Sequence, residues 1–368
     1  MRIFSLIFLL GALRLCAATE LPAPTEFNST PIQKKVLKRL HSHHGKEAAE
    51  QFFKTLGIDE ISKVEQSNLL LDGTWLSQVT ILREHTGMFS LLDDAQNIPF
   101  FAPESTDIAV QVTINLETLS ELIQQYHTLI GSNTQANSIL DQKIANSSLH
   151  DLLASPKTTF HLCIDFDENK ELFLGKESIG YPHFAFRIDG NHALFESILL
   201  HYIKTRNALF TQTKTKSQTT YSLPTYFADA IAGYVPNIEF DTEHDSTTIV
   251  SSAHMLERLH SESASLNNDP YFTKTWQNLP TSSSAKAYIS KRALEGFQRF
   301  YLLAIKEKWT DHPAFLQKKF QITAAVAQLN SSDSGLAIAI SSDKNKDTII
   351  NKSPFPSNFL LWLLQNSL

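Results

Sequence analysis

The spacing of hydrophobic and polar residues changes along the chain from a helical period to a strand period. Apolar residues recur at helical spacing after Pro31 and again over residues 46–56. Residues 75–82 are rich in β-branched and aromatic side chains and follow the turn pair Asp72-Gly73. The chain is therefore predicted to begin with two short helices and to continue with strands.

An internal repeat is the most informative feature of this pattern. Residues 107–115 alternate as a strand and lead into a helix, and residues 183–191 do the same. When the two copies are aligned, three residue pairs match: Ala109 with Ala185, Asn115 with Asn191, and Tyr126 with Tyr202. A strand with its following helix cannot bury its apolar face alone, so the repetition predicts a sheet that carries helices.

Two looser copies of the strand–helix unit follow, at residues 247–260 and 286–305. Hairpins are expected where the polar runs 167–170 and 343–347 separate apolar segments, and the polar residues 211–220 are interpreted as an exposed loop. The predicted fold class is α+β. Repeated strand–helix units and antiparallel hairpins are expected to form a mixed or antiparallel sheet covered by helices.

The first 18 residues have the pattern of a secretory signal. Arg2 supplies a positive start, residues 3–13 are mostly apolar, and small residues precede an expected cleavage site after Ala18. An uncleaved N-terminal anchor is the alternative, and Cys16 lies in the wrong context for a lipidated cysteine. The protein is therefore predicted to be periplasmic or secreted, with no transmembrane span in the mature chain, because the apolar run is too short to cross a bilayer.

Composition and length suggest a globular chain with more than one region. Hydrophobic residues make up 42% and charged residues 19% of the 368 positions, which is typical of a folded protein. We expect a signal peptide at 1–18, a tether with a short helix at 19–45, and a first α+β repeat region at 46–207. A second repeat region at 208–368 could be continuous with the first.

Charge and cysteine content narrow the environment and the partners. The 32 basic and 38 acidic residues give a net charge of -6, and loss of Arg2 and Arg14 with the signal would make it -8. The chain is therefore predicted not to bind nucleic acid, and the basic run at 34–39 is interpreted as the solvated face of a helix. Cys163 would be the single cysteine left, which excludes an intramolecular disulfide and fits a bacterial envelope.

No metal or cofactor site is assigned. His41, His43 and His44 form the densest histidine cluster, but no carboxylate or cysteine lies beside them at ligand spacing. Glu257 and His260 form a single Glu-x-x-His pair where a di-iron site needs two. The run of residues 165–169 begins like a calcium loop, but its sixth and twelfth positions are lysines, so it is interpreted as a hairpin turn.

No catalytic residue is assigned either. Ser283 and Lys286 match Ser-x-x-Lys, but the companion motifs of that enzyme class are absent. Cys163 lies among apolar residues and is interpreted as core. The sequence contains no Gly-x-Ser-x-Gly elbow, no P-loop and no Gly-x-Gly-x-x-Gly motif.

Several stretches of the chain resemble a loose group of uncharacterised secreted bacterial proteins built from tandem strand–helix repeats. These stretches are residues 86–92, the strand and helix that begin at Pro103, residues 266–280 and the strand at 287–290. The resemblance implies an envelope location and a repeat-built α+β body. It implies no reaction and no functional residues.

The leading functional hypothesis is a non-enzymatic envelope or extracellular protein that binds a protein partner or an apolar ligand. It depends on the absence of catalytic motifs and on the 24 phenylalanines, which supply large contact areas. The alternative is a secreted hydrolase with a spatially assembled acid/base site, built from Asp165, Asp167, Asp189 or a nearby histidine. A structural component of an assembly is a third possibility.

Overall fold

The structure is a computed structural model of the whole chain. It describes residues 25–27, 38, 46–47, 50, 54, 61–71, 73–83, 91–92, 97–129, 143–144, 147–148, 157–174, 177–206, 209–224, 234–261, 265–296, 332–343 and 345–354. The signal sequence, the histidine cluster at 41–44 and most of the two N-terminal helices predicted from the pattern lie outside these residues.

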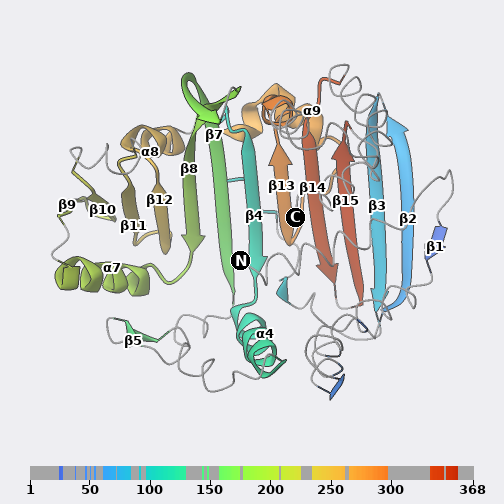
Figure 1. Cartoon of the computed structure of the whole chain (residues 1–368), viewed down its shortest axis with the longest axis horizontal. Coiled ribbons are helices and arrows are strands. Elements are labelled where there is room, and N and C mark those ends of the chain that lie inside the picture. Colours follow the sequence, from blue (N-terminus) through green and yellow to red (C-terminus); the bar gives the residue numbers. More distant parts are fainter. Residues whose placement is uncertain are drawn as a thin grey trace.

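One large sheet organises the protein (Figure 1). It has 13 strands, and every strand pairing is antiparallel. Across the sheet the order is β1 (Thr25–Phe27), β2 (Ile61–Leu71), β3 (Thr74–Arg83), β15 (Lys346–Ser353), β14 (Leu336–Asp343), β13 (Ala285–Ile289), β4 (Ile108–Ile114), β7 (Thr158–Leu174), β8 (Glu177–Asp189), β12 (Ser246–Val250), β11 (Asn237–Asp241), β10 (Gln218–Ser222) and β9 (Thr211–Lys214). A separate two-stranded ladder pairs β5 (Lys143–Ile144) with β6 (Ser147–Ser148).

The prediction of a mixed or antiparallel sheet covered by helices is wrong, because the structure is dominated by one large antiparallel sheet with few helices. The described helices are few and short beside the sheet: α4 (Leu116–Leu129), α7 (His192–Arg206), α8 (Ala253–His260), η5 (Leu266–Asn268) and α9 (Pro270–Trp276). Each helix lies toward an end of the sheet and leaves most strands without a helical layer (Figure 1). Every ladder is antiparallel, and several strands that follow one another in the chain, such as β2 with β3 and β7 with β8, are neighbours in the sheet, so no parallel crossover is required.

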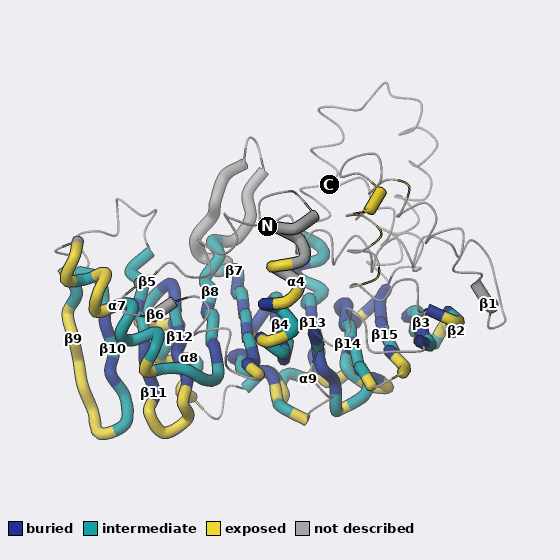
Figure 2. Tube along the Cα trace, turned by 90° about the horizontal axis from the view of Figure 1, so that it is seen from below, coloured by how far each residue is buried: buried dark blue, intermediate teal, exposed yellow. Residues whose placement is uncertain are grey.

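The strand–helix units are present, but their strands run in opposite directions, so their helices lie at opposite ends of the sheet. β4 and β8 are both antiparallel to β7, so they run in the same direction, and α4 and α7 follow them at one end. β12 and β13 run the opposite way, and α8 and the helical residues 291–296 follow them at the other end (Figure 1). α4 and α7 lie on one side of the sheet and α8 and α9 on the other (Figure 2).

The two faces of the central strands differ in chemistry. In β7, Thr159, His161, Cys163 and Asp165 point to one face, which we call the polar face. The intervening residues Phe160, Leu162 and Ile164 point to the other, which we call the apolar face. The register carries the same division into β4 and β8, where Gln111 and Arg187 flank His161 while Val110 and Phe186 flank Leu162.

Among the described residues, the polar face carries the larger packed core. A small core lies against its less polar row, where Ala109, Cys163, Ala185 and Val250 stand side by side in register. Residues of α8, η5, α9 and the segment around Phe100 close over this row: Met255, Leu266, Phe272, Phe100 and Ala102. Small side chains in the sheet let these helices approach closely, so the row is fully buried.

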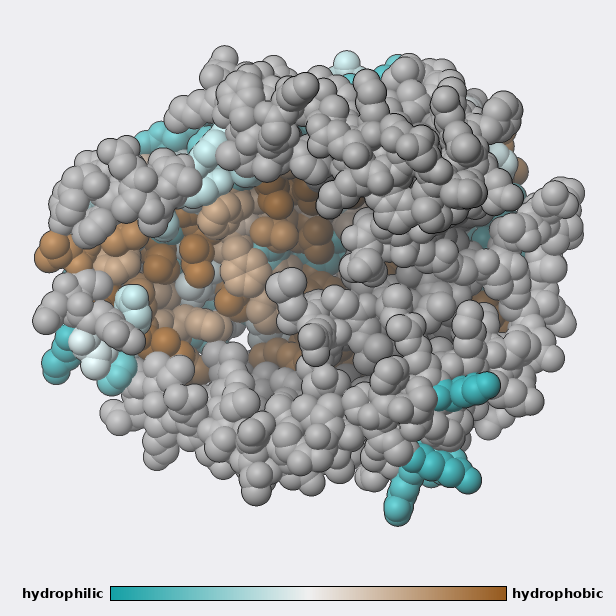
Figure 3. Space-filling model, viewed as in Figure 1, coloured by the Kyte–Doolittle hydropathy of each residue, from teal (hydrophilic) through white to brown (hydrophobic). Residues whose placement is uncertain are grey.

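Burial alternates along the central strands in the opposite sense to hydrophobicity. Ala109, Gln111 and Thr113 of β4 are buried, whereas Ile108, Val110 and Val112 between them keep partial contact with solvent. The same alternation runs through the described part of β7. Apolar side chains consequently gather on the face seen in Figure 3, over the strands between β11 and β4.

Several local predictions can be checked. The hairpin around 343–347 is confirmed by the pairing of β14 with β15. The turn predicted at 167–170 is wrong, because β7 runs on through it with a register shift between Asp167 and Glu171. The loop predicted at 211–220 is also wrong, since it forms β9 and β10, and all four residues of β9 are exposed. Part of the expected tether forms β1, which pairs with β2.

Candidate functional site

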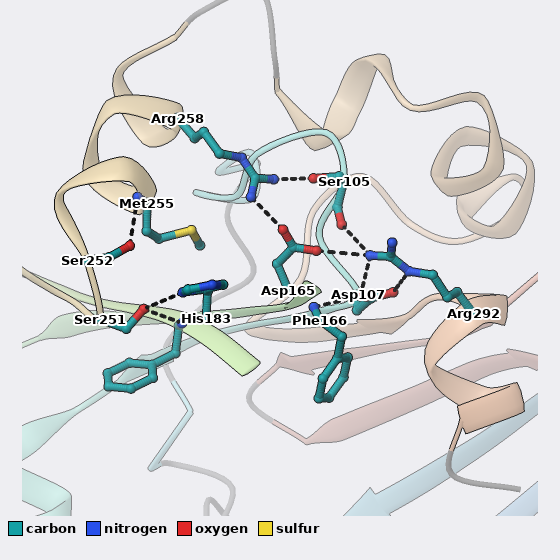
Figure 4. Close-up of polar contacts among 11 residues, drawn as sticks. Ser105, Asp107, Asp165, Phe166, His183, Ser251, Ser252, Met255, Arg258 and Arg292 are labelled. Carbon is teal, nitrogen blue, oxygen red and sulfur yellow. Dashed lines mark hydrogen bonds and ion pairs between the residues drawn. The ribbon is translucent and has the colours of Figure 1, made fainter. Parts of the chain in front are cut away.

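Two aspartates and two arginines form a closed ion-pair cluster at one end of the polar face (Figure 4). Arg292 contacts Asp107 through two nitrogens, with Nε 2.9 Å from Oδ1, and its terminal nitrogen lies 2.9 Å from Asp165 Oδ1. Arg258 binds Asp165 Oδ2 at 2.5 Å and donates to the hydroxyl of Ser105. With two positive and two negative groups the cluster is electrically balanced.

The fold explains why these groups meet. Asp107 immediately precedes β4, and its Oδ2 accepts the backbone N–H of Phe166 at 3.0 Å, while its Oδ1 accepts from the Ser290 hydroxyl at 2.5 Å. Each carboxylate oxygen of Asp107 and Asp165 already accepts from a charged or polar donor. This bonding favours a structural role that ties α8 and residues 291–296 to the sheet.

A second polar cluster, centred on the carboxylate of Asp189, lies at the other end of the polar face. Asp189 accepts from His161 Nε2 at 2.9 Å and from Arg187 Nε at 2.6 Å. Burial acts to raise the pKa of Asp189, but the hydrogen bond from His161 and the charge of Arg187 outweigh it, so the pKa lies below its usual range. The guanidinium of Arg187 also lies 4.5 Å from the ring centre of Phe101.

The structure does not bring the predicted hydrolase residues together. Asp189 is paired in register with Thr159, six residues along β7 from Asp165, which places the two carboxylates about 20 Å apart. Glycoside hydrolysis needs two carboxyl groups within about 10 Å. Asp167 belongs to β7, but its side chain lies outside the described part of the molecule.

Several other residues singled out from sequence have structural partners, whereas the buried hydroxyl of Ser283 makes no hydrogen bond with any described residue. Lys286 donates to the carbonyl of Ile98, and its ammonium lies 4.4 Å from the ring centre of Phe100, while burial lowers its pKa to about 8. Cys163 is completely buried, and burial raises its pKa to about 12, which suppresses the nucleophilic thiolate. His260 Nε2 lies 3.1 Å from Glu239.

Metal ligation finds no support in the described ranges. Among them, no three His, Cys, Asp or Glu side chains converge as metal ligands would. Residues 165–169, which begin like a calcium loop, run through the continuous strand β7 and the start of its register shift. The described helices also include none that is long and apolar enough to cross a membrane.

The apolar face forms the strongest candidate site. We define the apolar patch as the large apolar side chains of this face that keep partial solvent contact on five neighbouring strands: Ile108, Val110 and Val112 of β4, Phe160, Leu162 and Ile164 of β7, Phe184 and Phe186 of β8, Ile249 of β12, and Ile238 of β11. The patch extends about 19 Å across the strands and about 14 Å along β7.

Helix α7 borders this patch. It begins just after β8, and Glu196 on it accepts a hydrogen bond from Tyr221 of β10 at 3.1 Å, which fixes the helix over the apolar face. None of the described α7 side chains is fully buried, although the helix carries many apolar residues. Leu200 and Tyr202 are even largely exposed. A helix with apolar residues around its circumference normally lies in a core, so α7 also offers uncovered apolar surface.

Comparison of the chain with protein-family models, with curated proteins and with solved structures finds no match. The resemblance to secreted bacterial proteins therefore stays a prediction. The function has to be argued from the residues of this chain and from their arrangement.

Two features were not predicted from the sequence. One is the pair of arginines in the ion-pair cluster, and the other is the burial of the polar residues, in place of the large apolar ones, on the central strands. Arg258 and Arg292 lie on helices far from their partners in sequence, so no local pattern connects them with Asp165 or Asp107. The alternation of the central strands was visible, since Ile, Val, Phe and Leu alternate with Thr, Gln, His and Ala. Alternation identifies two faces, but it cannot tell which face other elements will cover.

Asp241 is expected to make stability depend on acid pH. Burial acts to raise its pKa, but hydrogen bonds from the His244 side chain at 2.9 Å, from the His244 and Glu243 backbone and from Gln218 lower it to about 2. A carboxyl whose pKa is depressed by folding stabilises the protein above about pH 4, and this contribution disappears as the pH falls toward about 2.

Asp241→Asn should therefore flatten the acid dependence. Between about pH 5 and about pH 3, the free energy of unfolding measured in urea should fall less for the variant than for the natural protein. Glu243→Gln, which removes an exposed carboxyl beside it, serves as the control and should leave the slope nearly unchanged. Equal slopes for the natural protein and Asp241→Asn would contradict this role of Asp241.

Proposed function

We propose that this protein is a non-enzymatic binding protein that holds an apolar ligand on the apolar patch. One observation carries the proposal: on the central strands the polar and small residues are buried, while the ten large apolar residues of the patch on the opposite face keep partial contact with solvent. Each partly exposed residue forgoes a share of the about 1.5–3 kcal/mol that full burial of a Leu or Phe side chain gives, so ten neighbouring residues of this kind form a surface that gains from a ligand.

The dimensions and chemistry of the patch favour a hydrocarbon chain. The hydrocarbon core of a bilayer is about 30 Å thick, so one lipid chain spans about 15 Å, which is close to the extent of the patch along β7. Every member of the patch is aliphatic or a phenylalanine. The rings of Phe160 and Phe186 are stacked with their centres 6.1 Å apart and their planes inclined by 24°, so they present a broad apolar surface.

Substitutions in the patch should weaken ligand binding while the protein stays folded. Leu162→Thr combined with Phe186→Thr keeps residues that suit strands but removes apolar contact. We expect the affinity for Nile red, a neutral apolar dye, to fall tenfold or more. Because both side chains already keep partial contact with solvent, each substitution should lower the free energy of unfolding by about 2 kcal/mol. Fluorescence titration and urea unfolding measure the two effects.

A matched control uses Leu69, a strand leucine on β2 that lies away from the patch and is 54% exposed. Leu69→Thr should leave dye binding unchanged. Absence of dye binding by the natural protein would overturn the proposal. If the protein instead forms oligomers on a sizing column that Leu162→Thr dissociates, the patch joins copies of the chain, and the ligand-binding proposal is rejected.

A further inference from the structure

Helix α7 is packed against the sheet less firmly than the other described helices. Each of the others has at least one fully buried side chain: Leu116 on α4, Met255 on α8, Leu266 on η5 and Phe272 on α9. None of the described side chains of α7 is buried, although the helix is rich in apolar residues. Because α7 has no such anchor, it can leave the sheet at a smaller cost than the other helices.

Polar contacts hold α7 to the strands beside it. At its start, the Nδ1 atom of His192 lies 2.5 Å from Oδ1 of Asp245. One turn later, Glu196 accepts from the hydroxyl of Tyr221 on β10 at 3.1 Å, and Gln212 of the exposed strand β9 donates to the same hydroxyl oxygen. Burial and the charge of Glu196 raise the pKa of Tyr221 to about 12, so the hydroxyl keeps the proton that it donates.

The junction between β8 and α7 has the backbone conformation of a hinge. Gly190 adopts φ +103 and Asn191 adopts φ 60, so consecutive residues lie in the left-handed region. Asn115, the counterpart of Asn191 before α4, does not have a positive φ. A left-handed backbone is unfavourable for a residue with a side chain, so a rotation at Asn191 relieves this cost. A few residues at the end of an element are enough to absorb the movement of a whole helix.

α7 lies at the end of the apolar face where the apolar patch stops (Figure 1). Ile188, Thr247 and Phe240 form one register row at this end, and all three are buried. The patch members of β8, β12 and β11 lie two residues further along the same strands and keep solvent contact. α7 contacts β11 and β12, so it contributes to covering the buried row. Its movement away from the sheet would lengthen the open apolar surface by about 7 Å, which is two residues of a strand.

We infer that α7 is a lid that turns about Gly190 and Asn191, admits an apolar ligand to the apolar patch and closes over it. This inference rests on the proposed function and names how access to that site is controlled. With the lid open, the ligand reaches the lengthened apolar surface. With the lid closed, exposed apolar side chains of α7 such as Leu200 gain cover from the ligand. A ligand that makes these contacts only with the closed lid shifts α7 toward the closed position.

The hydrogen bond between Tyr221 and Glu196 stabilises the closed lid with and without ligand, so its loss should change binding rates more than affinity. Tyr221→Phe removes the hydroxyl and keeps the ring. In stopped-flow measurements with Nile red, the association and dissociation rates should both rise about 3- to 10-fold, while the Kd changes less than about threefold.

Matched variants show whether this bond is responsible. Tyr202→Phe removes a hydroxyl from an exposed position on α7 and should leave both rates unchanged. Glu196→Gln keeps an acceptor for the Tyr221 hydroxyl and should retain the rates of the natural protein. A rise in the dissociation rate alone for Tyr221→Phe would make Tyr221 a ligand contact and overturn the lid.

Hydrogen exchange of the natural protein tests the movement without any variant. Saturating Nile red should slow amide exchange in α7 by about threefold or more and leave exchange in α8, on the other side of the sheet, unchanged (Figure 2). Exchange in α7 that Nile red does not slow would overturn the lid, while dye binding and the proposed function stand. Absence of dye binding by the natural protein would overturn the proposed function and the lid together.

Discussion

Replacing Arg83 with methionine is expected to lower the free energy of unfolding by about 3–5 kcal/mol. Arg83 on β3 and Asp347 on β15 form a bidentate pair, with Nε 2.6 Å from Oδ2 and a terminal nitrogen 2.7 Å from Oδ1. Their side chains are 1% and 0% exposed. Removing the guanidinium would take its bidentate charged partner away from the buried Asp347 carboxylate, which also accepts from the Ser342 hydroxyl at 2.7 Å.

A double variant separates the cost of an unpaired charge from the value of the pair. Arg83→Met with Asp347→Leu removes both charges and should recover most of the loss, because two apolar side chains can fill the same space. Lys63→Met breaks an exposed pair with Glu65 and should change stability by less than about 1 kcal/mol. Urea unfolding measures the free energy of unfolding of all three variants. A single Arg83→Met variant as stable as the natural protein would show that the pair is dispensable.

Phe272→Ala is expected to cost about 3–5 kcal/mol of unfolding free energy. Phe272 of α9 is buried in the core of the polar face, where its ring packs edge-on against Tyr288 at 5.1 Å and against Phe100 at 5.6 Å. Truncation would leave a cavity under α9 that the surrounding rings cannot fill. Differential scanning calorimetry and urea unfolding both report this loss.

The neighbouring residue supplies the control. Tyr271 precedes Phe272 on the same helix but is 63% exposed, so Tyr271→Ala should change stability by about 0.5 kcal/mol or less. If the two alanine variants were equally stable, the core on the polar face would not hold α9 to the sheet. Nile red binding should survive both changes, because neither residue belongs to the apolar patch.

The sequence predicted the strands well where alternation was clear and missed them where it was not. β4 and the first half of β7 alternate cleanly, and the structure places both as expected. Thr211–Lys214 has no apolar residue, so a pattern search interprets it as loop. At the edge of a sheet neither face of a strand must be buried, and pairing with β10 alone suffices.

The arrangement of helices could not be derived from local pattern. Residues 107–126 and 183–202 were correctly interpreted as strand–helix units, yet the strand–helix pattern suggested a layer of helices over the sheet. The direction in which each unit enters the sheet decides where its helix lies, and long-range pairing such as that of β13 with β4 sets this direction. Sequence spacing carries no information about such a pairing.

The apolar character of the candidate site was predicted from the sequence, but its position on the sheet was not. Abundant phenylalanine suggested apolar contact surface, and three of the residues in the apolar patch are phenylalanines of β7 and β8. Which face stays open depends on where Phe100 and the helices around Met255 pack. These elements pack against the side that carries Ala109 and Ala185, because small residues permit close approach.

The exposed strand β9 also bears on how such a chain avoids aggregation. A protein that leaves large apolar side chains in contact with water risks joining its sheet to that of another copy. β9 is only four residues long and reads Thr-Gln-Thr-Lys, with Lys216 following it in the turn. A second copy that paired with this edge would bring these lysines close to its own. The outermost strand therefore disfavours edge-to-edge growth of a fibre, and the apolar patch then stays available to the ligand proposed for it.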